Sequence, residues 1–236
     1  MDGPIVDAAH LEAPKANLEQ RLGRLDCCAV SDALDRLGQP AAVTGLRQFA
    51  SSRRICGRVV TFKLADRRTT AEPDGPRVHL GVRALETAGP GSVVVIEQRT
   101  GIDAASWGGI LSLAAKLYQI EGVIAEGAVR DIEEARALDL PVFSRGLTAR
   151  TARGRLVEAG TNVPVRIGDV EVAPGDYVVA DNSGVAFIAA DQAERVIAFA
   201  ESLAGREGSM AKSLLGGKPL HAVMGTSYET MLEEQS

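Results

Sequence analysis

A strand-like run that leads directly into a helical segment is the feature that most constrains this chain. Residues 121–131 place small and β-branched residues in a short buried strand, followed by a glycine turn and by a helix from residue 132. Arg130 and Asp131 are adjacent at that junction. Neighbouring side chains diverge by about 100° on a regular helix, but at a first turn both can lean over the carboxyl edge of the strand. We therefore expect a ligand site at this edge.

The chemistry of this pair indicates a class of reaction. A guanidinium can hold the planar oxygens of a 2-oxo acid through paired hydrogen bonds, and a carboxylate can hold a hard divalent metal. Chemistry at a carbonyl carbon needs both groups, so we expect a metal-assisted lyase that acts on small oxo acids. The alternative is that Asp131 only caps the helix, that Glu134 completes a capping box, and that Arg130 pairs with a surface carboxylate.

Composition indicates a single globular domain and disfavours nucleic-acid-binding and membrane proteins. A chain of 236 residues that is 45% hydrophobic can bury a full core, so we expect one domain over residues 1–236, with a helical N-terminal segment and a C-terminal helix and tail. The formal net charge is −5 and the basic residues are scattered in pairs, which disfavours nucleic acid as a ligand. No window approaches the roughly 18 apolar residues of a membrane span, and the acidic start lacks the basic region of a secretory signal. We expect a cytoplasmic protein that contacts no membrane.

Cysteine and histidine supply no local metal motif. Cys27, Cys28 and Cys56 form neither an even framework nor a C-x-x-C pair, so we expect reduced, buried thiols. The three histidines, at positions 10, 79 and 221, are far apart in the sequence. We interpret each histidine as structural or exposed.

Helical and strand segments alternate along the chain, with glycine or proline at most breaks. Helices are expected over residues 18–25, 31–38, 78–87, 108–119, 132–138 and 191–215. Strands are expected over residues 58–64, 92–96, 123–125, 141–143, 163–165, 170–172, 177–180 and 185–188. The last four strands are punctuated by turn residues, which is typical of a β-meander.

Two further features could take part in the chemistry. Gly108 and Gly109 open a helix, where unpaired amides and absent Cβ atoms would let a carboxylate approach, although tight packing against Trp107 would explain the glycines equally well. Carboxylates in the turn and the late helix could donate or relay a proton. For those in the late helix, Glu201 and Glu207, the simpler interpretation is solvated helix charge.

The ordered set of motifs resembles the 4-hydroxy-4-methyl-2-oxoglutarate aldolase family, which also contains the regulator of ribonuclease activity A. The motifs are SDAL at 31–34, WGGIL at 107–111, EGAVRD at 126–131, PVFSRG at 141–146, and PGD at 174–176 leading to ADNSGV at 180–185. The resemblance covers roughly residues 25–217.

This resemblance implies a fold, an assembly and an activity. The implied fold is a layered α/β/β/α sandwich of the RraA-like, swivelling phosphohistidine-like type. The implied assembly is a homotrimer or homohexamer with active sites at subunit boundaries. Enzymes of the family cleave 4-hydroxy-4-methyl-2-oxoglutarate-type acids to pyruvate and a second oxo acid, and many decarboxylate oxaloacetate. Their divalent metal is usually Mg²⁺ or Mn²⁺, and both reactions pass through a pyruvate enolate.

The resemblance also implies roles for individual residues. Arg130 would bind the oxo-acid oxygens and stabilise the enolate, and Asp131 would anchor the metal. The amides of Ile110 and Leu111, at the helix start formed by the two glycines, would hold the substrate carboxylate. Glu207 looks similar to the acid that a neighbouring subunit contributes.

The chain departs from the family pattern at three positions. Relatives often carry an acid where this chain has Gly109, and aspartate where it has Glu126. Glu126 is one methylene longer, so we hypothesise that it reaches toward the space beside Gly109 and contributes to the metal site. Ala149 stands where relatives tend to have proline. The alternatives are a non-catalytic regulator that binds a ribonuclease, and a specialised biosynthetic lyase or hydratase that reuses the same enolate chemistry.

Overall fold

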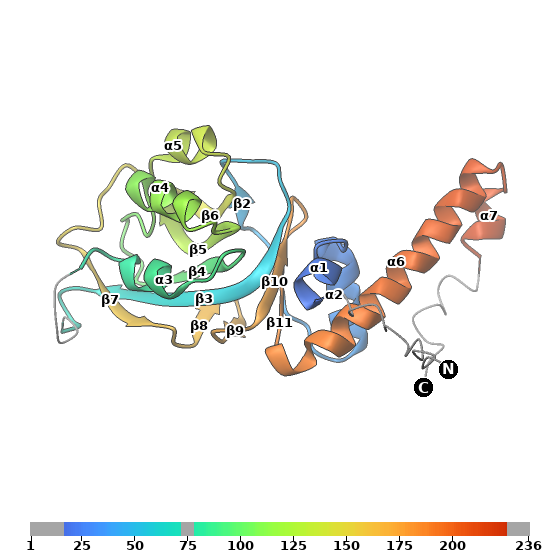
Figure 1. Cartoon of the computed structure of the whole chain (residues 1–236), viewed down its shortest axis with the longest axis horizontal. Coiled ribbons are helices and arrows are strands. Elements are labelled where there is room, and N and C mark those ends of the chain that lie inside the picture. The colour runs from blue at the N-terminus through green and yellow to red at the C-terminus, as the bar shows by residue number, and fades with distance from the viewer. Residues whose placement is uncertain (1–16, 72–77, 226–236) are drawn as a thin grey trace, which may run out of the picture.

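A long curved strand, β3 (Ile55–Asp66), joins the two halves of the sheet (Figure 1). The computed structural model describes residues 17–71 and 78–225. The first residues of β3 pair antiparallel with β10 (Tyr177–Ala180), and the later residues pair in parallel with β4 (Val93–Gln98). The end of β3 also pairs antiparallel with β7 (Leu156–Thr161). β3 therefore belongs to both halves, and its curvature lets them face one another.

The main sheet has the strand order β1-β11-β10-β3-β4-β5-β6-β2, with β7 beside β3. Its remaining strands are β1 (Ala42–Val43), β2 (Arg47–Gln48), β5 (Gly122–Val129), β6 (Val142–Leu147) and β11 (Val185–Ile188). A separate hairpin consists of β8 (Val165–Ile167) and β9 (Val170–Val172). The described helices are α1 (Leu18–Leu22), α2 (Cys27–Arg36), α3 (Val82–Thr87), α4 (Gly109–Leu117), α5 (Ile132–Ala137), α6 (Ala193–Leu215) and α7 (Leu220–Val223), with a 3-10 turn at Ala190–Gln192. Parallel strands β4, β5 and β6 are connected through α4 and α5.

Buried side chains lie on both sides of the two sheet halves and between them. Val94 and Val123 pack on the side of α3, α4 and α5. Val95 meets Val178 between the halves, and Val179 packs toward α2 and α6. Strands buried on both faces read as continuous apolar runs, as β4 and β10 do. The layered α/β/β/α sandwich expected from the resemblance is confirmed.

Several expected elements have different boundaries. The helix expected from residue 31 begins at Cys27, because the Asp26 carboxylate accepts a hydrogen bond from the amide of Ala29 at 2.8 Å and caps it. The strand expected over 123–125 continues to Val129, so there is no glycine turn before the helix. The expected four-stranded meander is wrong, because β8 and β9 form their own hairpin. Strand β7 was not expected from the sequence.

The long helix α6 extends away from the body of the molecule. Side chains of α6 are buried up to Leu203, and the rest of the helix extends beyond the sheet (Figure 1). Arg21 of α1 forms ion pairs with the first half of α6. Its guanidinium lies 2.7 Å from the Glu201 carboxylate and 2.5 Å from the Glu194 carboxylate. Within the part of the chain that the structure describes, no helix has both the length and the apolar content needed to cross a bilayer.

Candidate active site

A pocket of about 340 Å³ lies where the start of α4 meets the end of β5. Its walls come from residues 105–111, from the pair Arg130 and Asp131, from the segment that precedes α3, and from residues 151–153. Backbone contacts hold the first two walls together. The amide of Ser106 donates to the carbonyl of Ala128 at 2.8 Å, and the amide of Arg130 donates to the carbonyl of Trp107 at 3.1 Å. The junction at which the sequence predicts a ligand site borders this cavity, and the ligand itself stays a prediction.

Trp107 fixes the loop that leads into α4. Its side chain is 2% exposed, and its indole N–H donates to the Ser112 hydroxyl at 2.9 Å. Gly108 and Gly109, which follow Trp107, allow two carboxylates to approach closely. A Cβ atom at Gly108 would lie 2.8 Å from Asp131 Oδ2, and one at Gly109 would lie 1.8 Å from Glu134 Oε2. The glycine pair therefore leaves room for these two carboxylates.

Asp131 occupies the N-cap position of α5 in a left-handed conformation, with φ 54° and ψ 41°. This backbone region is unfavourable for residues other than glycine and is least so for Asn and Asp. Its carboxylate makes no capping bond to α5 and turns instead toward α4. Oδ2 accepts a hydrogen bond from the Gly109 amide at 3.0 Å and lies 3.3 Å from Arg130 Nε. The capping-box alternative for Asp131 and Glu134 is wrong.

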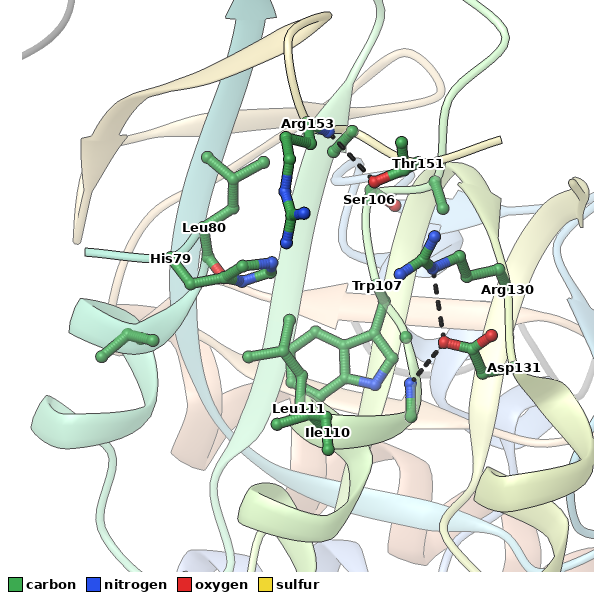
Figure 2. Close-up of a pocket in the computed structure, with 15 residues that line it drawn as sticks. His79, Leu80, Ser106, Trp107, Ile110, Leu111, Arg130, Asp131, Thr151 and Arg153 are labelled. Carbon is green, nitrogen blue, oxygen red and sulfur yellow. Dashed lines mark hydrogen bonds and ion pairs between the residues drawn. The ribbon is translucent and has the colours of Figure 1, made fainter. Parts of the chain in front are cut away.

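Arg130 and the first turn of α4 present positive groups to the pocket (Figure 2). Within the described residues, the Arg130 side chain pairs with Asp131, and it remains 38% exposed. The amides of Ile110 and Leu111 belong to the first helical turn and have no acceptor among the residues that the structure describes. A helix N-terminus with open amides beside a guanidinium can bind a carboxylate.

The opposite wall carries two more basic groups, from His79 and Arg153. Their side chains extend into the pocket from the side facing Arg130 (Figure 2). The Arg153 guanidinium has no hydrogen-bond or ion-pair partner among the described residues, while His79 Nδ1 lies 3.0 Å from the carbonyl oxygen of Leu80. No local sequence pattern indicated that either residue belongs to the pocket. His79 was interpreted as structural or exposed; it is exposed, and it also lines the pocket.

The prediction that Glu126 joins Asp131 at a metal ion is wrong. Glu126 lies within β5 and shares the strand face of Ile124, which packs between the sheet halves rather than toward α4. Its Oε2 accepts hydrogen bonds from Arg145 Nη2 at 3.1 Å and from the Gly168 amide at 2.9 Å. The carboxylate is 12% exposed and is occupied by these donors. The space beside Gly109 is filled by Glu134 instead.

Glu207 lies on the protruding half of α6 and is exposed. It does not line the pocket of its own chain. Its assignment to a neighbouring subunit's site therefore stays a prediction.

The three cysteines are free, but only Cys27 is buried. Cys28 is exposed, which corrects the expectation of three buried thiols.

The residues at the pocket fit a small, hard divalent ion. Asp131 and Glu134 bring carboxylates to the cradle left by the missing Cβ atoms of Gly108 and Gly109. In residues 17–71 and 78–225, no group of three or more His, Cys, Asp or Glu side chains could enclose a metal. Mg²⁺ usually takes one or two carboxylates and completes its shell with water and substrate oxygens. This donor set suits such an ion and does not suit a closed structural site.

Comparison with known proteins places these residues in a family context. The sequence profile described as RraA-like, Aldolase/RraA, matches residues 27–187. A Deinococcus radiodurans protein with the provisional name 4-hydroxy-4-methyl-2-oxoglutarate aldolase is 36% identical over 156 residues, which cover 66% of this chain and 89% of that protein. Protein DlpA of Legionella pneumophila is 30% identical over 181 residues, 77% of this chain, but the chain spans only 29% of its length.

A solved structure supports the fold. RraAS2 of Streptomyces coelicolor, described as an unusual member of the RNase ES inhibitor RraA protein family, superposes with a TM-score of 0.72. It is 24% identical, and the match covers 84% of this chain and 98% of that one.

Proposed function

Because the chain belongs to the RraA-like family, we propose that it is a divalent-metal-dependent lyase that cleaves a carbon–carbon bond of a small 2-oxo acid. The observation that carries this proposal is the convergence of Arg130, Asp131 and the open amides of Ile110 and Leu111 on one pocket. These are the groups that a 2-oxo acid needs at its carboxylate and its C2 carbonyl oxygen. The substrates proposed are 4-hydroxy-4-methyl-2-oxoglutarate-type acids and oxaloacetate.

The binding mode follows from the positions of these groups. The amides of Ile110 and Leu111 donate hydrogen bonds to the substrate's C1 carboxylate at the positive end of α4. Arg130 donates to the oxygens of the 2-oxo acid and limits the rotation of its carbonyl. Trp107, Leu80 and Ala152 contribute apolar surface to the pocket beside these polar groups.

The reaction moves negative charge toward Arg130. In the retro-aldol direction the C4 hydroxyl loses its proton, the C3–C4 bond breaks, and the electron pair forms an enolate at C2 and C3. In oxaloacetate the same bond breaks with release of CO₂. Asp131 would hold Mg²⁺ or Mn²⁺, which supplies a second positive charge near the C2 oxygen and lowers the pKa of water. Protonation of C3 then gives pyruvate.

The far wall favours an acid with a second anionic group. Arg153 and His79 lie across the pocket from Arg130, and Arg153 has no ion-pair partner among the described residues. A guanidinium in this position can bind a distal carboxylate of the substrate. We therefore propose that this lyase prefers 2-oxo diacids over monocarboxylic 2-oxo acids.

A neighbouring subunit completes the site in this proposal, within a homotrimer or homohexamer. Beside the pocket, α4 exposes an apolar stripe of Ile110, Leu113 and Leu117, whose exposed fractions are 80%, 46% and 75%. The protruding half of α6 carries Glu207 and the 90% exposed Leu215. Contact between these surfaces in adjacent subunits would cover apolar area and would bring an acid to the pocket. Mixing inactive Asp131→Asn and Glu207→Gln chains should restore activity, because some mixed sites contain both intact residues.

Metal-dependent pyruvate release tests the function. Purified protein is incubated with oxaloacetate or 4-hydroxy-4-methyl-2-oxoglutarate and with Mg²⁺ or Mn²⁺, in the presence and absence of chelator, and pyruvate is measured. We expect chelator-sensitive release, and a loss of roughly 10²–10³-fold in kcat for Arg130→Ala, as for removal of an oxyanion donor. Absence of pyruvate with either acid and either metal would contradict the proposal. It would favour the alternatives, a binding regulator of a ribonuclease or a biosynthetic lyase or hydratase with another substrate.

A further inference from the structure

Glu134 fills the space that Gly109 leaves open at the start of α4. A Cβ atom built on Gly109 would lie 1.8 Å from Glu134 Oε2 and 2.5 Å from its Cδ. The Glu134 carboxylate thus takes the volume that a side chain at position 109 would occupy. The carboxylate comes from α5, and Gly109 is the first residue of α4, so two different helices create this arrangement.

The position of Glu134 also relates it to Asp131. Asp131 is the N-cap residue of α5, and Glu134 follows it by three residues in the first turn of that helix. Asp131 Oδ2 accepts the Gly109 amide at 3.0 Å, so both carboxylates reach the same residue of α4. Glu134 has no cationic partner among the residues that the structure describes. Arg130 pairs with Asp131 alone, so the negative charge of Glu134 is left for a divalent ion to balance.

We propose that Glu134 is a positioning residue of the metal site, supplying from α5 the second acidic group that position 109 lacks. This inference rests on the proposed function. Asp131 would contact the ion itself, and Glu134 would accept hydrogen bonds from water molecules bound to the ion. Outer carboxylates of this kind orient the metal's ligands and commonly change its affinity by 10- to 100-fold.

A simpler role for Glu134 gives a different expectation. An acid near the first turn of α4 interacts favourably with the positive end of the helix dipole. In that case its loss would lower the stability of the protein and would leave metal affinity unchanged. Measurement of metal binding therefore separates the two roles, because it does not depend on turnover.

The experiment measures Mn²⁺ affinity by electron paramagnetic resonance of the free ion in wild type and variants. Glu134→Gln keeps the size of the side chain and removes its charge, and we expect Mn²⁺ to bind about 10-fold or more weakly. The matched control is Glu133→Gln, which removes an exposed acid of the same helical turn that does not face Gly109. The control should bind Mn²⁺ as wild type does.

Relocation of the acid provides a second, independent test. Gly109 lacks a positive φ, so aspartate is compatible with its backbone, and the atoms it would meet are the end of a flexible side chain. In Gly109→Asp the new carboxylate displaces Glu134 and takes its role. We expect Glu134→Gln to weaken Mn²⁺ binding in the wild-type background and to have no effect in the Gly109→Asp background. An equal loss in both backgrounds would overturn the inference.

The outcomes distinguish this inference from the proposed function. If wild type binds Mn²⁺ and releases pyruvate, and Glu134→Gln binds Mn²⁺ as tightly as Glu133→Gln does, only the role of Glu134 is wrong. If wild type neither binds Mn²⁺ nor releases pyruvate, the proposed function fails and the role of Glu134 fails with it. The expected weakening, with rescue by aspartate at position 109, supports both.

Discussion

Substitution of Asp131 by glycine, alanine and asparagine separates the two demands that the structure places on this position. The residue adopts a left-handed backbone, and its carboxylate accepts the amide of Gly109. Alanine loses the acceptor and keeps the unfavourable conformation, which costs a non-glycine residue about 1–2 kcal/mol. Glycine loses the same acceptor and relieves the conformational cost. Asparagine tolerates the conformation and retains an oxygen acceptor.

The magnitude follows from these terms. Glycine gains about 1–2 kcal/mol from the left-handed backbone relative to alanine and loses about 0.5–1 kcal/mol to the greater entropy of its unfolded chain. The free energy of unfolding of Asp131→Gly should therefore exceed that of Asp131→Ala by roughly 0.5–1 kcal/mol. Asp131→Asn should be nearly as stable as wild type. This order reverses the usual preference for alanine over glycine in helices.

Urea unfolding at pH 7 measures the stabilities, and Mn²⁺ binding measures the site. All three variants should lose Mn²⁺ affinity and pyruvate release, because none retains the carboxylate. An Asp131→Ala protein more stable than Asp131→Gly would refute the conformational argument. Full Mn²⁺ uptake and undiminished cleavage by Asp131→Asn or Asp131→Ala would refute the assignment of the metal site.

Three further predictions concern other parts of the molecule. Arg153→Ala should raise the KM for 2-oxo diacids more than for monocarboxylic 2-oxo acids, because it removes the proposed partner of the distal carboxylate. Burial raises the pKa of the Cys27 thiol to about 12, so at pH 8 iodoacetamide should label the exposed Cys28 in the native protein and Cys27 only after unfolding. The hydrogen bond from Arg21 lowers the pKa of the Glu201 carboxyl, so Glu201→Gln should cost roughly 1 kcal/mol or less at pH 7, measured by urea unfolding.

The direction of the Glu201 pKa shift determines how the stability contributed by its pair with Arg21 depends on pH. A carboxyl whose pKa is lower in the folded state stabilises the protein above its ordinary pKa, 4.5 here. That stability is lost as the pH falls through the lowered folded pKa, so the wild type and Glu201→Gln should converge in acid. A difference that grows in acid would contradict the role of the pair. Equal KM changes for both substrate classes in Arg153→Ala, or rapid native labelling of Cys27, would contradict the other two predictions.

Local sequence patterns determined much of the architecture. Apolar runs and turn residues predicted β10 and β11 with their observed boundaries and α6 nearly so, since hydrophobic periodicity and turn chemistry act over a few residues. The junction at Arg130 and Asp131 was predicted for the same reason. The order of the motifs identified the family, because the motifs are distributed over most of the chain.

Only the tertiary structure decided which acids approach the start of α4. Glu126 and Glu134 both lie within five residues of Asp131 in the sequence. Strand geometry nevertheless directs Glu126 between the sheet halves, while α5 directs Glu134 to Gly109. His79 and Arg153 join the pocket from segments remote in sequence from Arg130. These residues become neighbours of Arg130 because the chain folds back across the sheet. Contacts between residues far apart in the sequence leave no local periodicity. The sequence alone therefore determined the elements and their junction, but not which residues make up the site.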